Sequence, residues 1–308
     1  MFPRPKNIGA ALLAALTLTA VGATGPAIAQ PSGRQCPGLY VVTVPGTWET
    51  SVDEPRQGML SGAVDGLPGD VRVDHVAYAA TAFPWEGEVY GRSKREALDK
   101  ARAMVAGMAD ACASTRIALV GYSQGADAAG DLAAEIGTGN GVVAPERVVL
   151  VGLISDPRRS PVDNLIGPRV PGAGAGGPRA GFGRVTARTF TFCASGDLYC
   201  AMPEGDFAGR IAGLLAELSN PDPQHAGRYV QEASDLAGAA IAAGGVGLLA
   251  GQLDARAVEQ RRAQIEDFLK SGIHQSYPGY EVGPDGQTPL SWLRQCLIES
   301  ADDPDAHC

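Results

Sequence analysis

The sequence of 308 residues contains no run of basic residues and no evident internal repeat. It has 25 lysines and arginines against 34 aspartates and glutamates, for a formal net charge of −9. Binding to nucleic acid and electrostatic docking on anionic lipid both depend on clustered positive charge. We therefore expect neither a nucleic-acid partner nor electrostatic attachment to a membrane.

The sequence also lacks the spacing of a metal site, since no Cys-x-x-Cys and no His-x-x-x-His pattern occurs. Six cysteines, an even number, predict disulfides in an exported chain. Their spacing suggests a short local clip, a tie for the C-terminal tail, and a link from the first strand to a later helix. These pairs are Cys193–Cys200, Cys296–Cys308 and Cys36–Cys112.

The N-terminal residues predict a secretory signal. Arg4 and Lys6 precede an apolar core at Ile8–Val21, and the small residues of Ala27–Ala29 provide a cleavage site. We expect residues 1–29 to be removed, which leaves about 279 residues (308 − 29) as one domain, 30–308. The alternative is an uncleaved anchor, which the short and weakly flanked apolar core disfavours.

Gly121–Gly125 reads Gly-x-Ser-x-Gly directly after the apolar run Ile117–Val120 and before an alanine-rich segment, Gln124–Ile136. A strand, a sharp turn and a helix in this order predict a nucleophile elbow that exposes the hydroxyl of Ser123. The alternative is an ordinary strand–turn–helix with a helix-capping serine.

Apolar strands alternate with helical segments along the chain, which predicts an α/β fold: a three-layer αβα sandwich with a mostly parallel central sheet. The other expected strands are Leu39–Val44, Val71–Tyr78, Arg147–Ile154 and Thr189–Cys193, and a helix is expected over Ser93–Cys112.

Two segments depart from this alternation. Pro168–Gly183 is rich in glycine and proline, which predicts a loop. We expect this loop to form a flap near the site. Phe207–Lys270 predicts a helical block inserted over about residues 205–270, which could cover an acyl channel as a lid. Within it, Leu236–Gly251 carries no charge, and we favour a packed or lid helix there over direct contact with lipid.

A nucleophilic serine needs a histidine base and an acid that orients it, in the chain order Ser, Asp or Glu, His. Histidines are few: His225, His274 and His307 follow Ser123, and His307 stands too near the chain end. His75 precedes Ser123 in an expected strand, which favours a structural role.

Asp197 is the favoured acid, because it follows a strand and lies between Cys193 and Cys200, whose disulfide would hold the carboxylate at the strand's C-terminal edge. The rival is Asp156, also at a strand end. The proline and two arginines that follow it suggest a turn in which it pairs with its basic neighbours.

Four segments together resemble the cutinase family of small secreted serine esterases. Besides the elbow and the Cys-x-x-Gly-Asp-x-x-Cys loop, Gly46–Thr50 resembles the family's Gly-Ser-x-Glu loop, and His274–Tyr277 resembles its His-x-x-Tyr segment. Pro289, Trp292 and Leu293 follow in an apolar C-terminal helix. The resemblance covers about Cys36–Leu297 except the helical block. The larger, exported form of the chain resembles cutinase-like lipid esterases of mycolic-acid-bearing actinobacteria.

This resemblance implies that Ser123 is the nucleophile, Asp197 the acid and His274 the base. The backbone N–H groups of Gln124 and Thr47 would form the oxyanion hole, and no metal or cofactor is needed. Asp197 and His274 are 77 positions apart (274 − 197), further than in compact cutinases, which leaves His225 as a rival base. We favour His274, because an inserted block need not move the triad in space.

The expected function is hydrolysis of carboxylic esters with an apolar acid part, such as acylglycerols, phospholipids or polyesters, outside the cell or in its envelope. Peripheral contact with membrane or envelope lipid is compatible with this reading. The same triad would also serve an acyltransferase or thioesterase. A surface-binding protein that kept the fold without catalysis is less favoured, since every triad residue type is present. The resemblance to esterases disfavours a protease.

Overall fold

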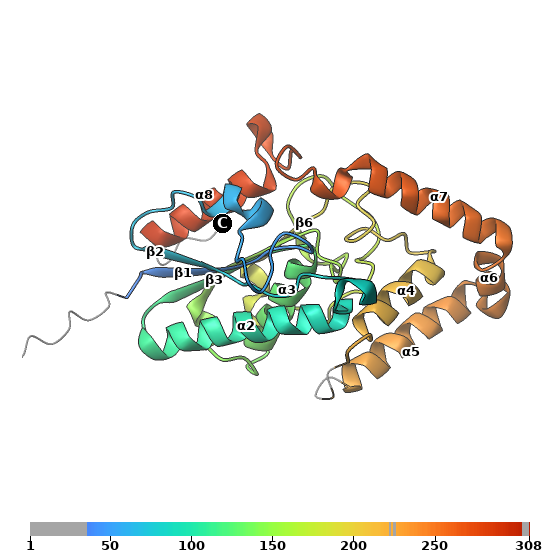
Figure 1. Ribbon diagram of the computed structural model, residues 1–308, viewed down its shortest axis with the longest axis horizontal. Helices are drawn as coiled ribbons and strands as arrows, with labels where there is room; N and C mark the ends of the chain where they lie inside the picture. Colours follow the sequence, from blue (N-terminus) through green and yellow to red (C-terminus); the bar gives the residue numbers. More distant parts are fainter. Residues whose placement is uncertain (1–35, 222, 224–225, 304–307) are drawn as a thin grey trace, which may run out of the picture. The chain divides into compact units, whose positions relative to one another are not determined.

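Six parallel strands form one sheet in the order β2-β1-β3-β4-β6-β5 (Figure 1). The computed structural model describes residues 36–221, 223, 226–303 and 308; the expected signal segment lies outside them. The strands are β1 (Leu39–Val44), β2 (Val71–His75), β3 (Arg116–Tyr122), β4 (Val148–Ile154), β5 (Asn164–Leu165) and β6 (Thr189–Phe192). The carboxyl ends of β3, β4 and β6 therefore meet at one edge of the sheet.

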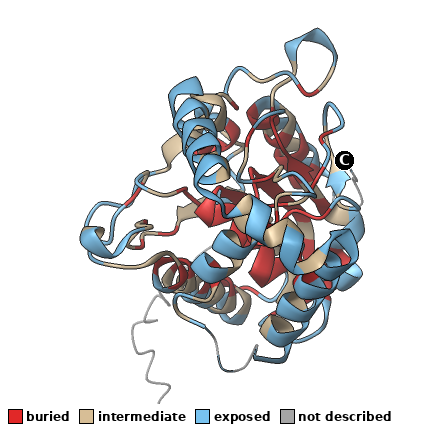
Figure 2. Cartoon of the chain, turned by 90° about the vertical axis from the view of Figure 1, so that its right-hand side faces the viewer, coloured by how far each residue is buried: buried red, intermediate tan, exposed pale blue. Residues whose placement is uncertain are grey.

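Helices cover both faces of the sheet (Figure 1). Successive residues of β1 alternate between two cores: Tyr40 and Val42 pack in the core of α2 (Tyr90–Ala111) and α3 (Gln124–Gly137), whereas Leu39 and Val41 pack in the core of the opposite face. The helices of that second face are α1 (Ser61–Val64) and α8 (Pro289–Asp302). The buried residues concentrate between these layers (Figure 2). The structure confirms the predicted α/β fold with a parallel central sheet.

Two element boundaries differ by three residues from the sequence expectation. The strand expected to reach Tyr78 ends at His75, and the helix expected from Ser93 begins at Tyr90. Burial continues beyond the end of strand pairing, since Val76 and Tyr78 are both inaccessible to solvent. An apolar pattern reports burial, so it extends the expected strand past its last paired residue.

The helical block consists of α4 (Phe207–Glu217), α5 (Ala226–Ala243), α6 (Gly245–Gln252) and α7 (Ala255–Ser271). The uncharged segment spans the second half of α5 and nearly all of α6. Leu236 and Ala240 pack against Phe207, whereas Ile241 and Val246 are 73% and 84% exposed. No single described helix is long and apolar enough to cross a membrane; α5 and α6 together meet that test of length and composition as a pair bent by 95°.

Buried ion pairs join the helical block to the two helices of the first core. Lys94 Nζ of α2 lies 2.9 Å from Asp127 Oδ1 and 2.9 Å from Asp131 Oδ2, both of α3, and 2.7 Å from Glu217 Oε2 at the end of α4. All four side chains are buried. The three carboxylates raise the pKa of Lys94 against the opposing effect of burial, so the ammonium stays charged.

The Gly/Pro-rich segment is a loop, but hydrogen bonds anchor it. Arg179, within this loop, is buried, and its guanidinium lies 2.6 Å from Asp156 Oδ2 and 3.0 Å from Asp131 Oδ1. The backbone N–H groups of Gly174 and Gly176 donate to the carbonyl groups of Arg159 and Pro157. The loop is therefore held against the end of β4 by both its backbone and its charged side chain.

Candidate active site

Ser123 connects β3 to α3 in a strained conformation, with φ 55° and ψ −123°. Glycine is required on both sides of it. A Cβ on Gly121 would lie 2.5 Å from the carbonyl oxygen of Gly125, and a Cβ on Gly125 would lie 2.0 Å from the carbonyl oxygen of Val44. The turn can be this tight only without those side chains, which explains the Gly-x-Ser-x-Gly pattern.

The structure brings the three side chains of the expected triad into one hydrogen-bonded row. His274 Nε2 lies 2.9 Å from Ser123 Oγ, and His274 Nδ1 lies 2.9 Å from Asp197 Oδ2. The Asp197 side chain is fully buried and that of His274 is 13% exposed. One face of this row therefore remains open to a reactant.

The chain returns from the helical block directly to this row. Gly272 ends α7 in the left-handed conformation, with φ 66°, and the next residues form the 3-10 turn Ile273–Gln275. The hydroxyl of Tyr122, at the end of β3, donates to the carbonyl oxygen of His274 over 2.7 Å. The helices between Asp197 and His274 thus do not displace His274 from the elbow.

Asp197 accepts more hydrogen bonds than the sequence indicated. Besides His274, the hydroxyls of Ser155 and Tyr277 donate to Asp197 Oδ2, over 2.6 Å and 2.7 Å. Burial by itself would raise the pKa of Asp197, but these partners outweigh it and hold the pKa below its ordinary value. The carboxylate therefore stays ionised beside the imidazole.

The sequence reasoning assigned no role to Ser155 or Tyr277. Ser155 follows β4 with φ 53°, and its Oγ also lies 3.1 Å from His274 Nδ1. The signal for Tyr277 was its place three residues after His274. The only sequence signal for Ser155 was its position at the end of a strand, and the neighbouring Asp156 shares that position.

The rival residues lie elsewhere. His225 and His307 fall outside the described residues. The turn expected at Asp156 is present, since the backbone N–H groups of Arg158 and Arg159 donate to its Oδ1 and to its carbonyl oxygen. Its carboxylate forms an ion pair with Arg179, 23 positions further along the chain, and not with the side chains of those two arginines. His75 lies in β2, as expected, with Nδ1 2.5 Å from Thr43 Oγ1.

The two residues expected to form the oxyanion hole border the elbow. Gln124 is the first residue of α3, so its N–H has no acceptor within the helix. Thr47 follows Gly46, where a Cβ would lie 3.3 Å from the Cβ of Ser123. Glu49 fixes this loop, because its carboxylate accepts the N–H groups of Gly46 and Met59, each over 2.8 Å. Burial raises the pKa of Glu49, and the two N–H groups oppose that shift.

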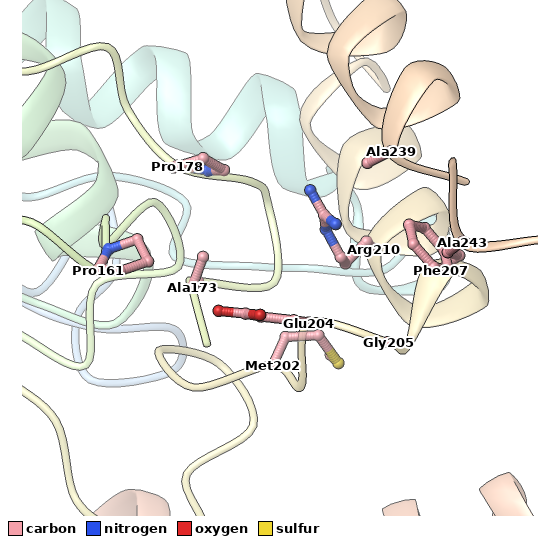
Figure 3. Close-up of a pocket in the computed structure, with 11 residues that line it drawn as sticks. Pro161, Ala173, Pro178, Met202, Glu204, Gly205, Phe207, Arg210, Ala239 and Ala243 are labelled. Carbon is pink, nitrogen blue, oxygen red and sulfur yellow. The ribbon is translucent and has the colours of Figure 1, made fainter. Parts of the chain in front are cut away.

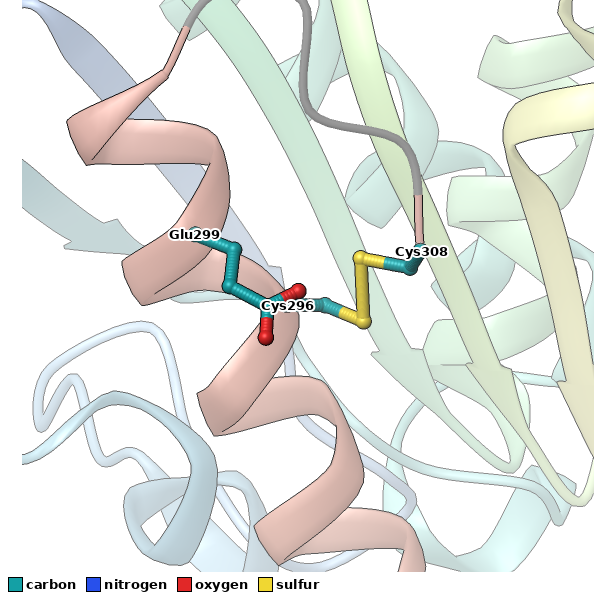
Figure 4. A group of neighbouring side chains, drawn as sticks. All are labelled: Cys296, Glu299 and Cys308. Atoms are coloured by element: carbon teal, nitrogen blue, oxygen red, sulfur yellow. A yellow bond between two sulfur atoms is a disulfide. The ribbon is translucent and has the colours of Figure 1, made fainter.

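The six cysteines are paired as Cys36–Cys112, Cys193–Cys200 and Cys296–Cys308, which agrees with the sequence expectation. Figure 4 shows that Glu299 lies beside the last pair. Metal binding by cysteine requires a thiolate, and both sulfurs here belong to a disulfide. This group is therefore a covalent tie between α8 and the C-terminal residue.

A cavity of about 480 Å³ lies between the Gly/Pro-rich loop and the helical block (Figure 3). The loop contributes Ala173 and Pro178, and the block contributes Phe207, Arg210 and Ala243. This volume falls in the range of small-molecule pockets. The triad side chains are not among its lining residues, so the expected acyl channel under a lid remains a prediction.

A parallel αβα sandwich with a strained serine at the strand–helix turn defines the class of the protein, the α/β-hydrolase fold. The chain belongs to the cutinase family of serine esterases: the family model described as Cutinase matches residues 35–211.

The carboxylesterase Culp6 homolog of Corynebacterium glutamicum is 33% identical over 206 residues, 54% of this chain and 66% of that protein. The chain thus aligns with slightly less than two thirds of that relative. The structure of lysin B from mycobacteriophage D29 is 15% identical with a TM-score of 0.50, over 87% of this chain and 100% of that one. An acetyl xylan esterase core from Trichoderma reesei is 21% identical with a TM-score of 0.44, over 59% and 94%. The similarity to lysin B supports the fold alone.

Proposed function

We propose that the protein is an exported serine esterase with Ser123 as nucleophile, His274 as general base and Asp197 as the acid that orients it. The observation that carries this proposal is the pair of 2.9 Å contacts from the two imidazole nitrogens to Ser123 and Asp197. Membership of the cutinase family supports the same chemistry.

In the first step, Ser123 Oγ attacks the ester carbonyl carbon while His274 Nε2 takes its proton. The N–H groups of Gln124 and Thr47 bind the negative oxygen that develops. Each such donor contributes on the order of 3 kcal/mol to transition-state binding. The imidazolium then returns the proton to the leaving alcohol, and the bond between the carbonyl carbon and the alcohol oxygen breaks. Water releases the acid from Ser123 by the same steps.

For the substrate we propose esters with an apolar acid part, such as acylglycerols, phospholipids or polyesters. The resemblance of the sequence to lipid-active members of the family supports this class. We further propose residues 1–29 as a signal peptide, residues 30–308 as one catalytic domain with the helical insertion, and action outside the cell or in its envelope, at times against a lipid surface. Three disulfides are consistent with an oxidising compartment.

The test combines a fluorophosphonate probe with hydrolysis of p-nitrophenyl esters. We expect the probe to label the protein and the label to vanish in Ser123→Ala. His274→Ala should reduce kcat by about 10³-fold or more, whereas His225→Ala should leave it unchanged. An unlabelled wild type would favour a binding protein without catalysis, and full activity in His274→Ala would exclude His274 as the base.

A further inference from the structure

Phe268, near the end of α7, brings a side chain of the helical block close to His274. Among the last ten residues of α7, Arg262–Ser271, Phe268 is partly buried and the other nine are exposed. Its ring lies 5.6 Å from that of Tyr199, edge to face, and 6.4 Å from the imidazole of His274. Phe268 belongs to the inserted block and Tyr199 to the disulfide loop, so two distant segments form this aromatic wall.

Tyr199 is itself the partly open neighbour of the imidazole. Its ring centroid lies 4.4 Å from that of His274. A third ring, that of Tyr122, lies 5.1 Å from the imidazole and is buried, whereas Tyr199 is 38% exposed. The backbone N–H of Tyr199 donates to Asp197 Oδ1 over 3.0 Å, which holds the residue beside the acid. A molecule approaching His274 therefore meets Tyr199 and Phe268.

The direction of proton transfer shows which part of an ester would lie there. His274 Nε2 must deliver its proton to the leaving alcohol oxygen, so that oxygen comes within hydrogen-bond distance of the imidazole. The carbonyl oxygen points instead to the N–H groups of Gln124 and Thr47. Groups beside the imidazole consequently border the alcohol portion of the ester.

The surface next to this wall is apolar. Ile265 precedes Phe268 by three residues and Leu269 by four on α7, so Ile265 is a neighbour of both on the helix surface. They are 46% and 63% exposed. An alcohol with an apolar chain or ring would bury this surface, whereas a methyl group would not reach it.

We propose that Tyr199 and Phe268 form a subsite for the leaving alcohol that selects esters of apolar alcohols over methyl esters. The proposal rests on the esterase function proposed above and adds the alcohol specificity. Both residues contact the substrate in it, and neither moves a proton. Because the alcohol leaves before deacylation, the subsite acts on kcat/KM of acylation and not on hydrolysis of the acyl enzyme.

The experiment uses two ester series measured by proton release. Methyl, hexyl and benzyl butyrate vary the alcohol, and methyl acetate, butyrate and octanoate vary the acid. For the wild type we expect higher kcat/KM for hexyl and benzyl butyrate than for methyl butyrate. Phe268→Ala and Tyr199→Ala should each lower kcat/KM for the apolar alcohols by about tenfold and leave the ratios within the acid series unchanged within about twofold. Tyr199→Phe, which keeps the ring, should resemble the wild type.

Val258→Ala is the matched control, since Val258 is an exposed apolar residue of the same helix, ten positions from Phe268 and thus about 15 Å away. An equal loss on every ester in Phe268→Ala would indicate a purely structural role and overturn the proposal. A change in the kcat/KM ratios within the acid series would instead show that Tyr199 and Phe268 contact the acyl chain, and it would also overturn the proposal. If the wild type hydrolyses no ester, the proposed function fails with it; hydrolysis with unchanged ratios in the variants refutes the subsite alone.

Discussion

The hydroxyl of Tyr277 donates a 2.7 Å hydrogen bond to Oδ2 of Asp197, the same oxygen that faces the imidazole of His274. The same hydroxyl accepts the backbone N–H of Ala194 over 3.0 Å. One buried phenol thus stabilises the charge of the acid and satisfies the backbone at the start of its loop.

Tyr277→Phe should therefore destabilise the protein by about 1–3 kcal/mol, because it leaves a buried N–H without an acceptor. It should also raise the pKa of Asp197, which loses a donor to its charged form. The depressed pKa of Asp197 contributes stability above the unfolded pKa, and that contribution is lost as the pH falls through the folded pKa. Urea unfolding over a range of acidic pH should show the variant losing stability at a higher pH than the wild type.

Tyr280→Phe is the control for this substitution. The ring of Tyr280 contacts that of Tyr277, but its buried hydroxyl has no hydrogen-bond partner among the described residues. We expect Tyr280→Phe to leave stability and its pH dependence unchanged. A similar loss in both variants would mean that ring packing, and not the bond to Asp197, explains the effect.

Glu49→Ala should lower kcat by about 10²-fold with little change in KM, because the loop that carries Thr47 loses the acceptor of two backbone N–H groups. Steady-state hydrolysis of a p-nitrophenyl ester measures this change. Glu54→Gln alters a carboxylate near the same loop that is 65% exposed, and it should behave as the wild type. An unaltered kcat in Glu49→Ala would show that the loop keeps its position without this carboxylate.

Removal of the disulfides should affect stability and kcat in opposite rank order. Loss of a cross-link costs more when it closes a longer loop, so removing Cys36–Cys112, with a separation of 76, should cost about 4.5 kcal/mol. Removing Cys193–Cys200, with a separation of 7, should cost about 2.5 kcal/mol. The order for kcat should be the reverse, since the shorter loop carries Asp197.

Double alanine variants, compared by thermal unfolding and by kcat at a temperature where each is folded, test this reversal. The Cys296–Cys308 pair serves as the control, because it ties the C-terminal residue to α8 and does not enclose a triad residue. Equal effects of all three pairs on kcat would argue that the short disulfide does not position Asp197.

The docking of the helical block should weaken as the pH rises. Burial, and next the charge of Asp127, raise the pKa of Glu217 to about 8 against the opposing charge of Lys94. A carboxyl whose pKa is higher in the folded state contributes stability that is fully present below its unfolded pKa and is lost as the pH rises through the folded pKa. Stability should therefore decrease from about pH 4.5 to about pH 8.

Glu217→Gln should flatten that decrease, because glutamine stays neutral throughout, while Glu259→Gln on the exposed surface of α7 should not. Thermal unfolding at intervals of pH measures both slopes. A wild type whose stability is constant over this range would contradict the raised pKa of Glu217 in the folded protein.

Several features followed from local sequence alone. Two glycines around Ser123 predicted the strained turn, because a Cβ on Gly121 or on Gly125 would lie only 2.5 Å or 2.0 Å from a backbone carbonyl oxygen. The alternation of apolar strands with helices predicted the parallel sheet, and the spacing of Cys193 and Cys200 predicted a closed loop around Asp197. In each case the physical cause acts within a few residues of the chain, so the local sequence predicts the structure before the fold is known.

The partners of polar side chains depended on the tertiary structure. Tyr277 is 80 positions from Asp197, and Lys94 is 123 positions from Glu217. The carboxylate of Asp156 forms its ion pair with Arg179 and not with the arginine side chains that follow it in the sequence. A sequence shows which residues carry hydroxyls and charges but not which of them meet, because those distances arise only when separate segments pack. The same reason explains why the sequence left the choice between His274 and His225 open. Loop-closure entropy grows slowly with length, so the long helical segment between Asp197 and His274 is tolerated. Only the packed structure places the imidazole of His274 beside Ser123.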